Sequence, residues 1–139
     1  MAPDDSTVFR VADLSSVVVN LPDTHALVQL SEAEAPFRTL EFPIALTDAA
    51  AIMHAKESTV GIRPSTHELL AEIMNQSHTE IIALRITDRV DGTLHGELDV
   101  MSARGRFTVQ CRPSDGLTLC LRQTVPAPIL INAELFELT

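Results

Sequence analysis

Two copies of the tripeptide Arg-Pro-Ser, at residues 63–65 and 112–114, are the positions of this sequence that most directly suggest chemistry. Arginine binds phosphate through its guanidinium, and proline and serine are favoured where helices begin. Since the free amides of a helix start attract anions, each copy predicts a phosphate-binding site: Arg63 with Ser65, and Arg112 with Ser114. The alternative is structural, because the same preferences make this tripeptide a good helix start.

Ionisable side chains accompany three expected helix starts. His67 lies two residues after Ser65, Asp115 follows Ser114, and Asp48 opens a further predicted helix. Phosphodiester hydrolysis needs an activated water and compensation of charge on phosphate oxygens, for which a histidine base and carboxylates holding Mg²⁺ or Mn²⁺ are common solutions. If the helix starts converge, we predict His67, Asp115 and Asp48 as catalytic residues, with Asp48 and Asp115 as metal ligands. Alternatively, both aspartates complement helix dipoles and His67 caps or packs.

The second tripeptide lies where a strand over residues 107–111 turns into a helix. Apolar and polar residues alternate along this strand. Pro113 lacks an amide hydrogen and ends the strand ladder, and Ser114 is expected to cap the helix. An ion pair between Arg112 and Asp115 that ties this corner together is the structural alternative to a site.

Two more helices are expected to position the other candidates. The first runs from residue 47 to about 56, with Ala49, Ile52 and Met53 as its apolar stripe. In the second, Ser65 and Glu68 fit a capping box, in which each satisfies a backbone amide of the other. The predicted buried face of this second helix consists of Leu69, Leu70, Ile73 and Met74.

Strands make up most of the remaining chain. The predicted strand segments are 7–14, a β-branched run at 17–19, 25–30, 37–44, a three-stranded meander over 82–111, and 125–131. Three antiparallel strands with one apolar face need a covering layer, which helices provide. The predicted fold is α+β: a mixed, largely antiparallel sheet with three main helices packed on it, in one domain over 7–139 after a polar tail over 1–6.

Several predictions concern exposure. Residues 31–36 are expected to form a solvated loop, and Glu97 and Asp99 to lie on a solvated strand face with cross-strand ion pairs to arginines. Pro126 and Pro128 favour an edge position for the strand over 125–131. An open sheet edge there or at the N-terminal strands predicts a homodimer or higher homo-oligomer.

Composition restricts the function classes. The net charge of −9 and the absence of Trp and Tyr argue against strong non-specific nucleic-acid binding. The sequence shows neither the pattern of a signal peptide nor an apolar run of membrane-spanning length, so we expect no membrane association and a cytoplasmic location. Cys111 and Cys120 are expected to be reduced and buried.

Four blocks together resemble the bifunctional nuclease domain family. They are Ile-Ala-Leu-Thr-Asp-Ala-Ala-Ala-Ile at 44–52, Arg-Pro-Ser-Thr-His-Glu-Leu-Leu at 63–70, Ile-Thr-Asp with Asp-Gly-Thr over 86–93, and Cys-Arg-Pro-Ser-Asp-Gly-Leu-Thr-Leu at 111–119. The resemblance spans roughly residues 9–137 and implies an α+β fold and nuclease activity on DNA and RNA. Asp48 stands where the family usually has Glu, and Gly116 where it usually has Ala.

The function predicted from these observations is a nuclease that hydrolyses phosphodiester bonds in DNA or RNA with help from Mg²⁺ or Mn²⁺. The alternative is a non-catalytic, oligomeric binding module for a partner protein or a small anionic ligand. Acidity and scarce aromatic residues favour the module, and the four blocks favour the nuclease.

Overall fold

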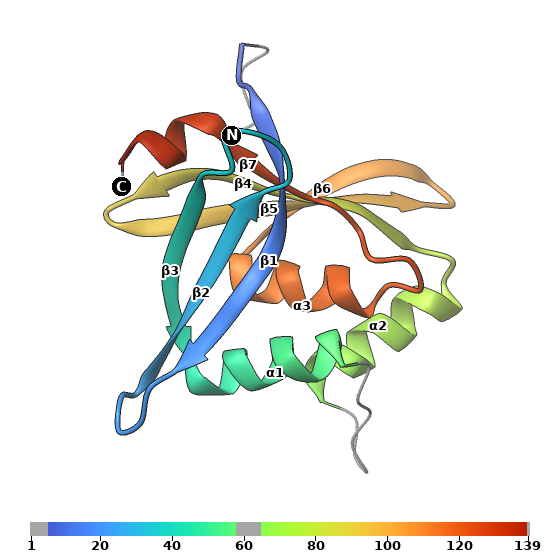
Figure 1. Ribbon diagram of the computed structural model, residues 1–139. Coiled ribbons are helices and arrows are strands. Elements are labelled where there is room, and N and C mark those ends of the chain that lie inside the picture. Colours follow the sequence, from blue (N-terminus) through green and yellow to red (C-terminus); the bar gives the residue numbers. More distant parts are fainter. Residues whose placement is uncertain (1–5, 58–64, 139) are drawn as a thin grey trace.

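The computed structural model of the chain describes residues 6–57 and 65–138, and one seven-stranded sheet dominates it, in the order β3-β2-β1-β7-β4-β5-β6 (Figure 1). The strands are β1 (Phe9–Val19), β2 (His25–Glu32), β3 (Thr39–Ala45), β4 (Glu80–Val90), β5 (Thr93–Ser102), β6 (Gly105–Cys111) and β7 (Ile129–Asn132). The pairing is antiparallel except between β4 and β7, which run parallel. The open sheet and its helices confirm the predicted α+β class.

Three α-helices form a layer against the sheet: α1 (Leu46–Lys56), α2 (Thr66–Gln76) and α3 (Pro113–Arg122) (Figure 1). α3 is the central helix, with contacts to α1, α2, β4 and β5, and most of its residues are buried. Fully buried side chains from both layers, including Leu30, Ile52, Leu84 and Leu117, form the core between them. A 3₁₀ helix, η1 (Ala133–Leu138), follows β7 and packs against β3.

The predicted buried face of α2 is wrong for three of its four residues, and the fourth, Met74, is partly buried against the core. Leu69, Leu70 and Ile73 are exposed, and the structure buries none of the α2 residues fully. The residues that α2 turns inward include His67, Glu68, Ala71 and Met74. The helix packs mainly against α3, which it contacts with a partly polar side, so among the described residues no element covers its apolar stripe. Met53 of α1 is likewise exposed.

The last strand does not lie at an edge. β7 begins at Ile129, after both prolines, and lies between β1 and β4 in the middle of the sheet. Pro126 and Pro128 therefore remove no amide from the strand ladder, and the Pro128 carbonyl accepts a hydrogen bond from Leu84 N at 3.0 Å. The edges of the sheet are β3 and β6.

Two predicted solvated segments contain buried acids. β2 continues to Glu32, whose buried carboxylate accepts hydrogen bonds from Arg10 Nε and Arg38 Nε, each at 2.6 Å. Glu97 and Asp99 of β5 are also buried, which corrects the predicted solvated face. The expected cross-strand ion pairs do occur there. Arg85 Nε lies 2.9 Å from Glu97, and Arg106 pairs with Asp99.

Candidate functional site

The junction between β6 and α3 places an arginine at the start of a buried helix. Arg112 is the N-cap residue in an extended conformation, and Pro113 occupies the first helical turn, where its missing amide hydrogen costs nothing. Ser114 is buried and does not cap the helix, which corrects that prediction. Its carbonyl accepts a hydrogen bond from Thr118 Oγ1 at 3.0 Å. The junction therefore presents Arg112 to solvent while the next residues anchor it.

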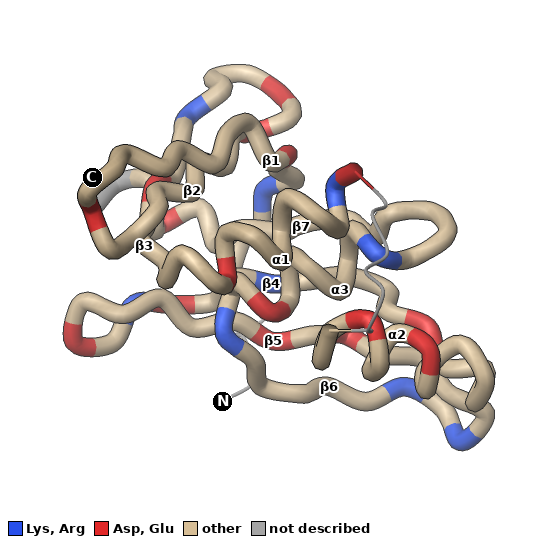
Figure 2. The backbone as a smooth tube through the Cα atoms, turned by 90° about the horizontal axis from the view of Figure 1, so that it is seen from below, with Lys and Arg blue, Asp and Glu red and all other residues tan. Residues whose placement is uncertain are grey.

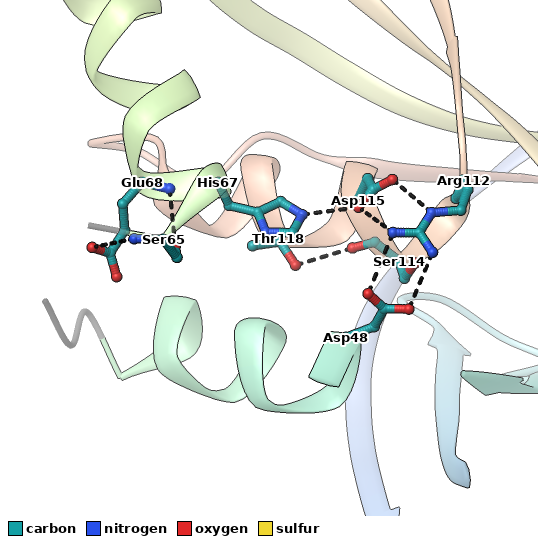
Figure 3. Close-up of polar contacts among 8 residues, drawn as sticks. All are labelled: Asp48, Ser65, His67, Glu68, Arg112, Ser114, Asp115 and Thr118. Carbon is teal, nitrogen blue, oxygen red and sulfur yellow. Dashed lines mark hydrogen bonds and ion pairs between the residues drawn. The ribbon is translucent and has the colours of Figure 1, made fainter. Parts of the chain in front are cut away.

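Arg112 joins two carboxylates from different helices (Figure 3). It binds Asp115 through Nε and Nη2 at 2.8 and 2.9 Å. It reaches Asp48, at the start of α1, through Nη1 and Nη2 at 3.2 and 3.3 Å. The Asp115 contact is the tighter of the two, and the Arg112 side chain keeps 63% of its surface exposed. Arg112 is thus held firmly on one side and more loosely on the other.

Asp115 also binds His67 from α2. The distance between His67 Nε2 and Asp115 Oδ1 is 2.8 Å, and the imidazole is mostly buried, with 19% of its surface exposed. The starts of α1, α2 and α3 therefore meet, and Asp48, His67, Arg112 and Asp115 form one connected cluster (Figure 3). We call these four residues the Arg112 cluster.

The start of α2 is fixed by a second set of contacts. Ser65 and Glu68 form the predicted capping box, with Glu68 N donating to Ser65 Oγ at 3.2 Å and Ser65 N donating to Glu68 Oε2 at 3.3 Å. Glu68 also accepts a hydrogen bond from Arg122 Nη2 at 3.2 Å, which ties α2 to the end of α3. Sequence reasoning missed Arg122, because no local pattern links it to Glu68, 54 residues earlier.

The predicted phosphate-binding residues are therefore not all together. Arg112 lies in the cluster, and Ser114 lies beside it but is buried. Ser65 lies on the far side of His67 from Arg112, and its hydroxyl is engaged in the capping box (Figure 3). Arg63 lies outside the described residues, so the structure does not bear on the prediction for it.

Charge pairing sets the ionisation of the cluster. The Arg112 guanidinium, through its hydrogen bonds, holds the pKa of Asp115 below its usual range, and the hydrogen bond from His67 adds to this effect. Asp115 in turn raises the pKa of Arg112. At neutral pH Asp115 is therefore a carboxylate that only accepts hydrogen bonds, so Nε2 of His67 carries a proton. In the neutral imidazole, Nδ1 is then left with the free lone pair.

Cys111, the residue before Arg112, is not a candidate nucleophile. Burial, followed by the charge of Asp115, raises the pKa of its thiol to about 11. The thiol is therefore protonated at neutral pH, whereas the thiolate is the nucleophilic form. Both cysteines are free thiols, as predicted, with Cys120 buried and Cys111 partly buried.

As arranged, the predicted metal ligands do not present a divalent-cation site. Both Asp48 and Asp115 point their carboxylates at the Arg112 guanidinium. Within residues 6–57 and 65–138, no group of three His, Cys, Asp or Glu side chains is placed to hold a metal ion. A metal ion at these carboxylates would have to displace Arg112.

The fold and the cluster define an α+β protein with an arginine–aspartate–histidine centre at the junction of three helices. Residues 28–139 match the bifunctional nuclease domain family, and the chain belongs to that family. It is also similar to two proteins of Mycobacterium tuberculosis, uncharacterized protein MT1877 of strain CDC 1551 and uncharacterized protein Rv1829 of strain H37Rv. Each is 31% identical over 108 residues, which cover 78% of this chain and 63% of the relative, so the chain spans less than two thirds of their length.

The described part of the chain contains no helix that is both long and apolar enough to cross a membrane.

Proposed function

We propose that the chain is a nuclease that hydrolyses phosphodiester bonds in DNA or RNA at the Arg112 cluster. The observation that carries the proposal is that one ionised carboxylate, Asp115, holds both a largely exposed arginine and a histidine base candidate. An arginine that binds phosphate and a histidine that activates water are two of the groups that phosphodiester hydrolysis needs.

In this proposal His67 is the general base. Asp115 accepts a hydrogen bond from the Nε2–H group and so fixes the imidazole orientation and its tautomer. Nδ1 is then the nitrogen that takes a proton from the attacking water. Carboxylates orient catalytic histidines in the same way in other hydrolases. Asp115 acts through His67 and Arg112 and is thus a positioning residue.

Arg112 binds the phosphate and stabilises the charge that develops on its oxygens. Its Nε and Nη2 are engaged by Asp115, so the edge that it can offer a substrate is the one now occupied by Asp48. The longer Asp48 contacts favour this carboxylate as the partner that the phosphate replaces. We thus assign Asp48 to holding Arg112 in place before substrate binds.

The experiment is a cleavage assay with the purified protein and a single-stranded DNA or RNA oligonucleotide. We expect the wild type to cleave the oligonucleotide. We expect the cleavage rate to fall about 10²–10⁴-fold in His67→Ala, since this is the usual contribution of a general base. His54→Ala, an exposed histidine on α1, is the matched control and should cleave at the wild-type rate. Equal cleavage by all three proteins would exclude His67 as the base.

The same assay with Mg²⁺, with Mn²⁺ and with chelator tests the predicted metal requirement. Because Arg112 occupies both carboxylates, we expect cleavage to continue in chelator. Loss of cleavage in chelator, with recovery on adding either ion, would show that a metal replaces Arg112 at Asp48 and Asp115.

A non-catalytic binding module is the second candidate function. The observation that favours it is that two carboxylates already satisfy Arg112, in a chain of net charge −9. The absence of cleavage under every metal condition, together with saturable binding of a partner protein or a small anion that Arg112→Ala abolishes, would favour this function over the nuclease.

A further inference from the structure

The two edges of the sheet differ in how they are protected from pairing with another strand. Edge strands of natural proteins carry charges or proline, which discourage such pairing. β3 has both, in Glu41 and Pro43. β6 contains no proline, and its one charged residue, Arg106, is paired with Asp99 of its own chain. Within residues 6–57 and 65–138, its outer backbone hydrogen-bonding groups therefore lie at an edge that neither proline nor an unpaired charge protects from a further strand.

β6 also exposes apolar side chains on one face. The register aligns Leu84 of β4, Leu98 of β5 and Val109 of β6 in one row across the sheet. This row lies on the face covered by α3, because Leu84 packs under Gly116. The cover stops before the edge, and Val109 and Phe107 remain 45% and 47% exposed. A neighbouring strand could cover both residues.

Charge points to the kind of neighbour that fits. The chain carries a net charge of −9, so two copies repel each other over most of their surfaces. β6 has no acidic residue, so its trace carries no red in Figure 2, and its one basic residue, Arg106, lies near its start. Arg106 is already paired with Asp99 of its own chain. This edge is therefore where a second copy can approach with little repulsion.

We propose that β6 pairs antiparallel with β6 of a second copy, about a two-fold axis at Thr108. A two-fold axis perpendicular to the sheet places the corresponding faces of the two copies on the same side of the joined sheet. The axis must therefore pass through a residue of β6, so that residues from the same face lie opposite each other. The register centred on Thr108 places Phe107 opposite Val109 twice. Such aromatic–β-branched pairs stabilise neighbouring strands. The same register sets Arg106 opposite Gln110, so no two charges of one sign face each other.

Neighbouring registers pair these residues less well. Centred on Phe107, the two strands would place Val109 opposite Gly105, and centred on Val109 they would place Phe107 opposite the partly buried Cys111. Only the Thr108 register uses both exposed apolar residues in both copies. The resulting dimer has one continuous sheet that runs through both chains, and it does not depend on the proposed nuclease activity.

The direct test is oxidative cross-linking of the full chain carrying Thr108→Cys. Residues opposite each other in an antiparallel pair have Cα atoms about 4.5–5.5 Å apart, within the range that a disulfide spans. We expect a covalent dimer that a reducing agent separates into single chains. Ile73→Cys on α2 is the control, because Ile73 is even more exposed than the β6 residues but lies outside the proposed interface. Wild-type protein measures the background from Cys111 and Cys120.

Sedimentation of untagged wild-type protein and of Phe107→Lys supplies a second measurement. The wild type should sediment as two 15.1 kDa chains, and the lysine should weaken the dimer at least about tenfold, with unchanged far-ultraviolet circular dichroism as the check on folding. A wild-type mass of one chain would overturn the proposal. So would cross-linking of Ile73→Cys but not Thr108→Cys, or a Phe107→Lys dimer as stable as the wild type.

Discussion

The Arg112 cluster depends on unequal contacts to a single guanidinium. Asp115 holds Arg112 at 2.8 and 2.9 Å, whereas Asp48 contacts it at 3.2 and 3.3 Å from another helix. Ion pairs with half-exposed arginines contribute little stability, because water and salt screen them. Exchange of Asp48 for a substrate phosphate is therefore inexpensive, while the Asp115 contacts keep the guanidinium oriented.

The change Asp48→Asn tests this exchange. The amide is a weaker competitor for Arg112 than the carboxylate, so we expect KM for a short single-stranded oligonucleotide to fall by up to about fivefold, with kcat nearly unchanged. Steady-state cleavage kinetics measure both constants. A large loss of kcat would instead identify Asp48 as a catalytic residue or a metal ligand.

At the level of elements, the buried Glu32 joins β2 to Arg10 of β1 and to Arg38, which lies before β3. Hydrogen bonds from Arg38, followed by those from Arg10, lower the pKa of Glu32 to about 2, against an ordinary value of 4.5. Since the folded state holds the proton less tightly than the unfolded state, Glu32 stabilises the fold fully above pH 4.5. This stabilisation is lost as pH falls from 4.5 through 2.

We expect Glu32→Gln to melt below the wild type at neutral pH, and this gap in Tm to narrow as pH falls below 4.5. Thermal unfolding at a series of pH values measures the gap. A gap that stays constant down to the lowest accessible pH would show that the ionisation of Glu32 does not stabilise the fold.

The packing of α3 against the sheet depends on Gly116. A Cβ at this position would lie 2.5 Å from Leu84 Cδ1 and 3.2 Å from Cys111 Sγ, and Leu84 is fully buried. Alanine favours helix by about 1 kcal/mol over glycine, but overpacking costs about 1–3 kcal/mol. We therefore expect Gly116→Ala to lower the free energy of unfolding by about 1 kcal/mol in denaturant titrations.

Leu84→Val provides the control, because it removes the colliding methyl group. In that background Gly116→Ala should raise the free energy of unfolding. If Gly116→Ala stabilises the protein with Leu84 in place as well, the Leu84 side chain moves aside without loss of stability. The close approach of α3 to the sheet then contributes nothing to the free energy of unfolding.

At the level of the whole molecule, the sheet, its helices and the strand-to-helix corner at Pro113 could be predicted because each depends on local patterns. The environment of α2 could not be predicted from the sequence. Its apolar stripe suggests burial, yet His67 and Glu68 face inward, because their partners Asp115 and Arg122 lie about 50 residues further along the chain. Glu32 appears solvated in sequence for the same reason, since its two arginines come from different segments.

Net charge leads to a prediction about salt. A chain of charge −9 repels a long polyanion, and raising ionic strength from about 0.01 to 0.1 M shortens the screening length from about 30 to 10 Å. We expect kcat/KM for a long single strand to rise over this range, because whole-molecule repulsion outweighs the loss at one arginine contact. A steep fall, as basic nucleic-acid-binding proteins show, would point to a phosphate-binding surface larger than the Arg112 cluster.

The central claim is that His67 and Asp115 act as one unit on the phosphodiester. The most direct measurement is kcat for oligonucleotide cleavage in His67→Ala, Asp115→Asn and the double variant. Residues that act as a unit are strongly non-additive, so the loss of kcat in the double variant should be much smaller than the product of the two single losses. It should exceed the His67→Ala loss only by what Asp115 contributes through Arg112. Losses that multiply in the double variant, or no loss in either single variant, would contradict the claim.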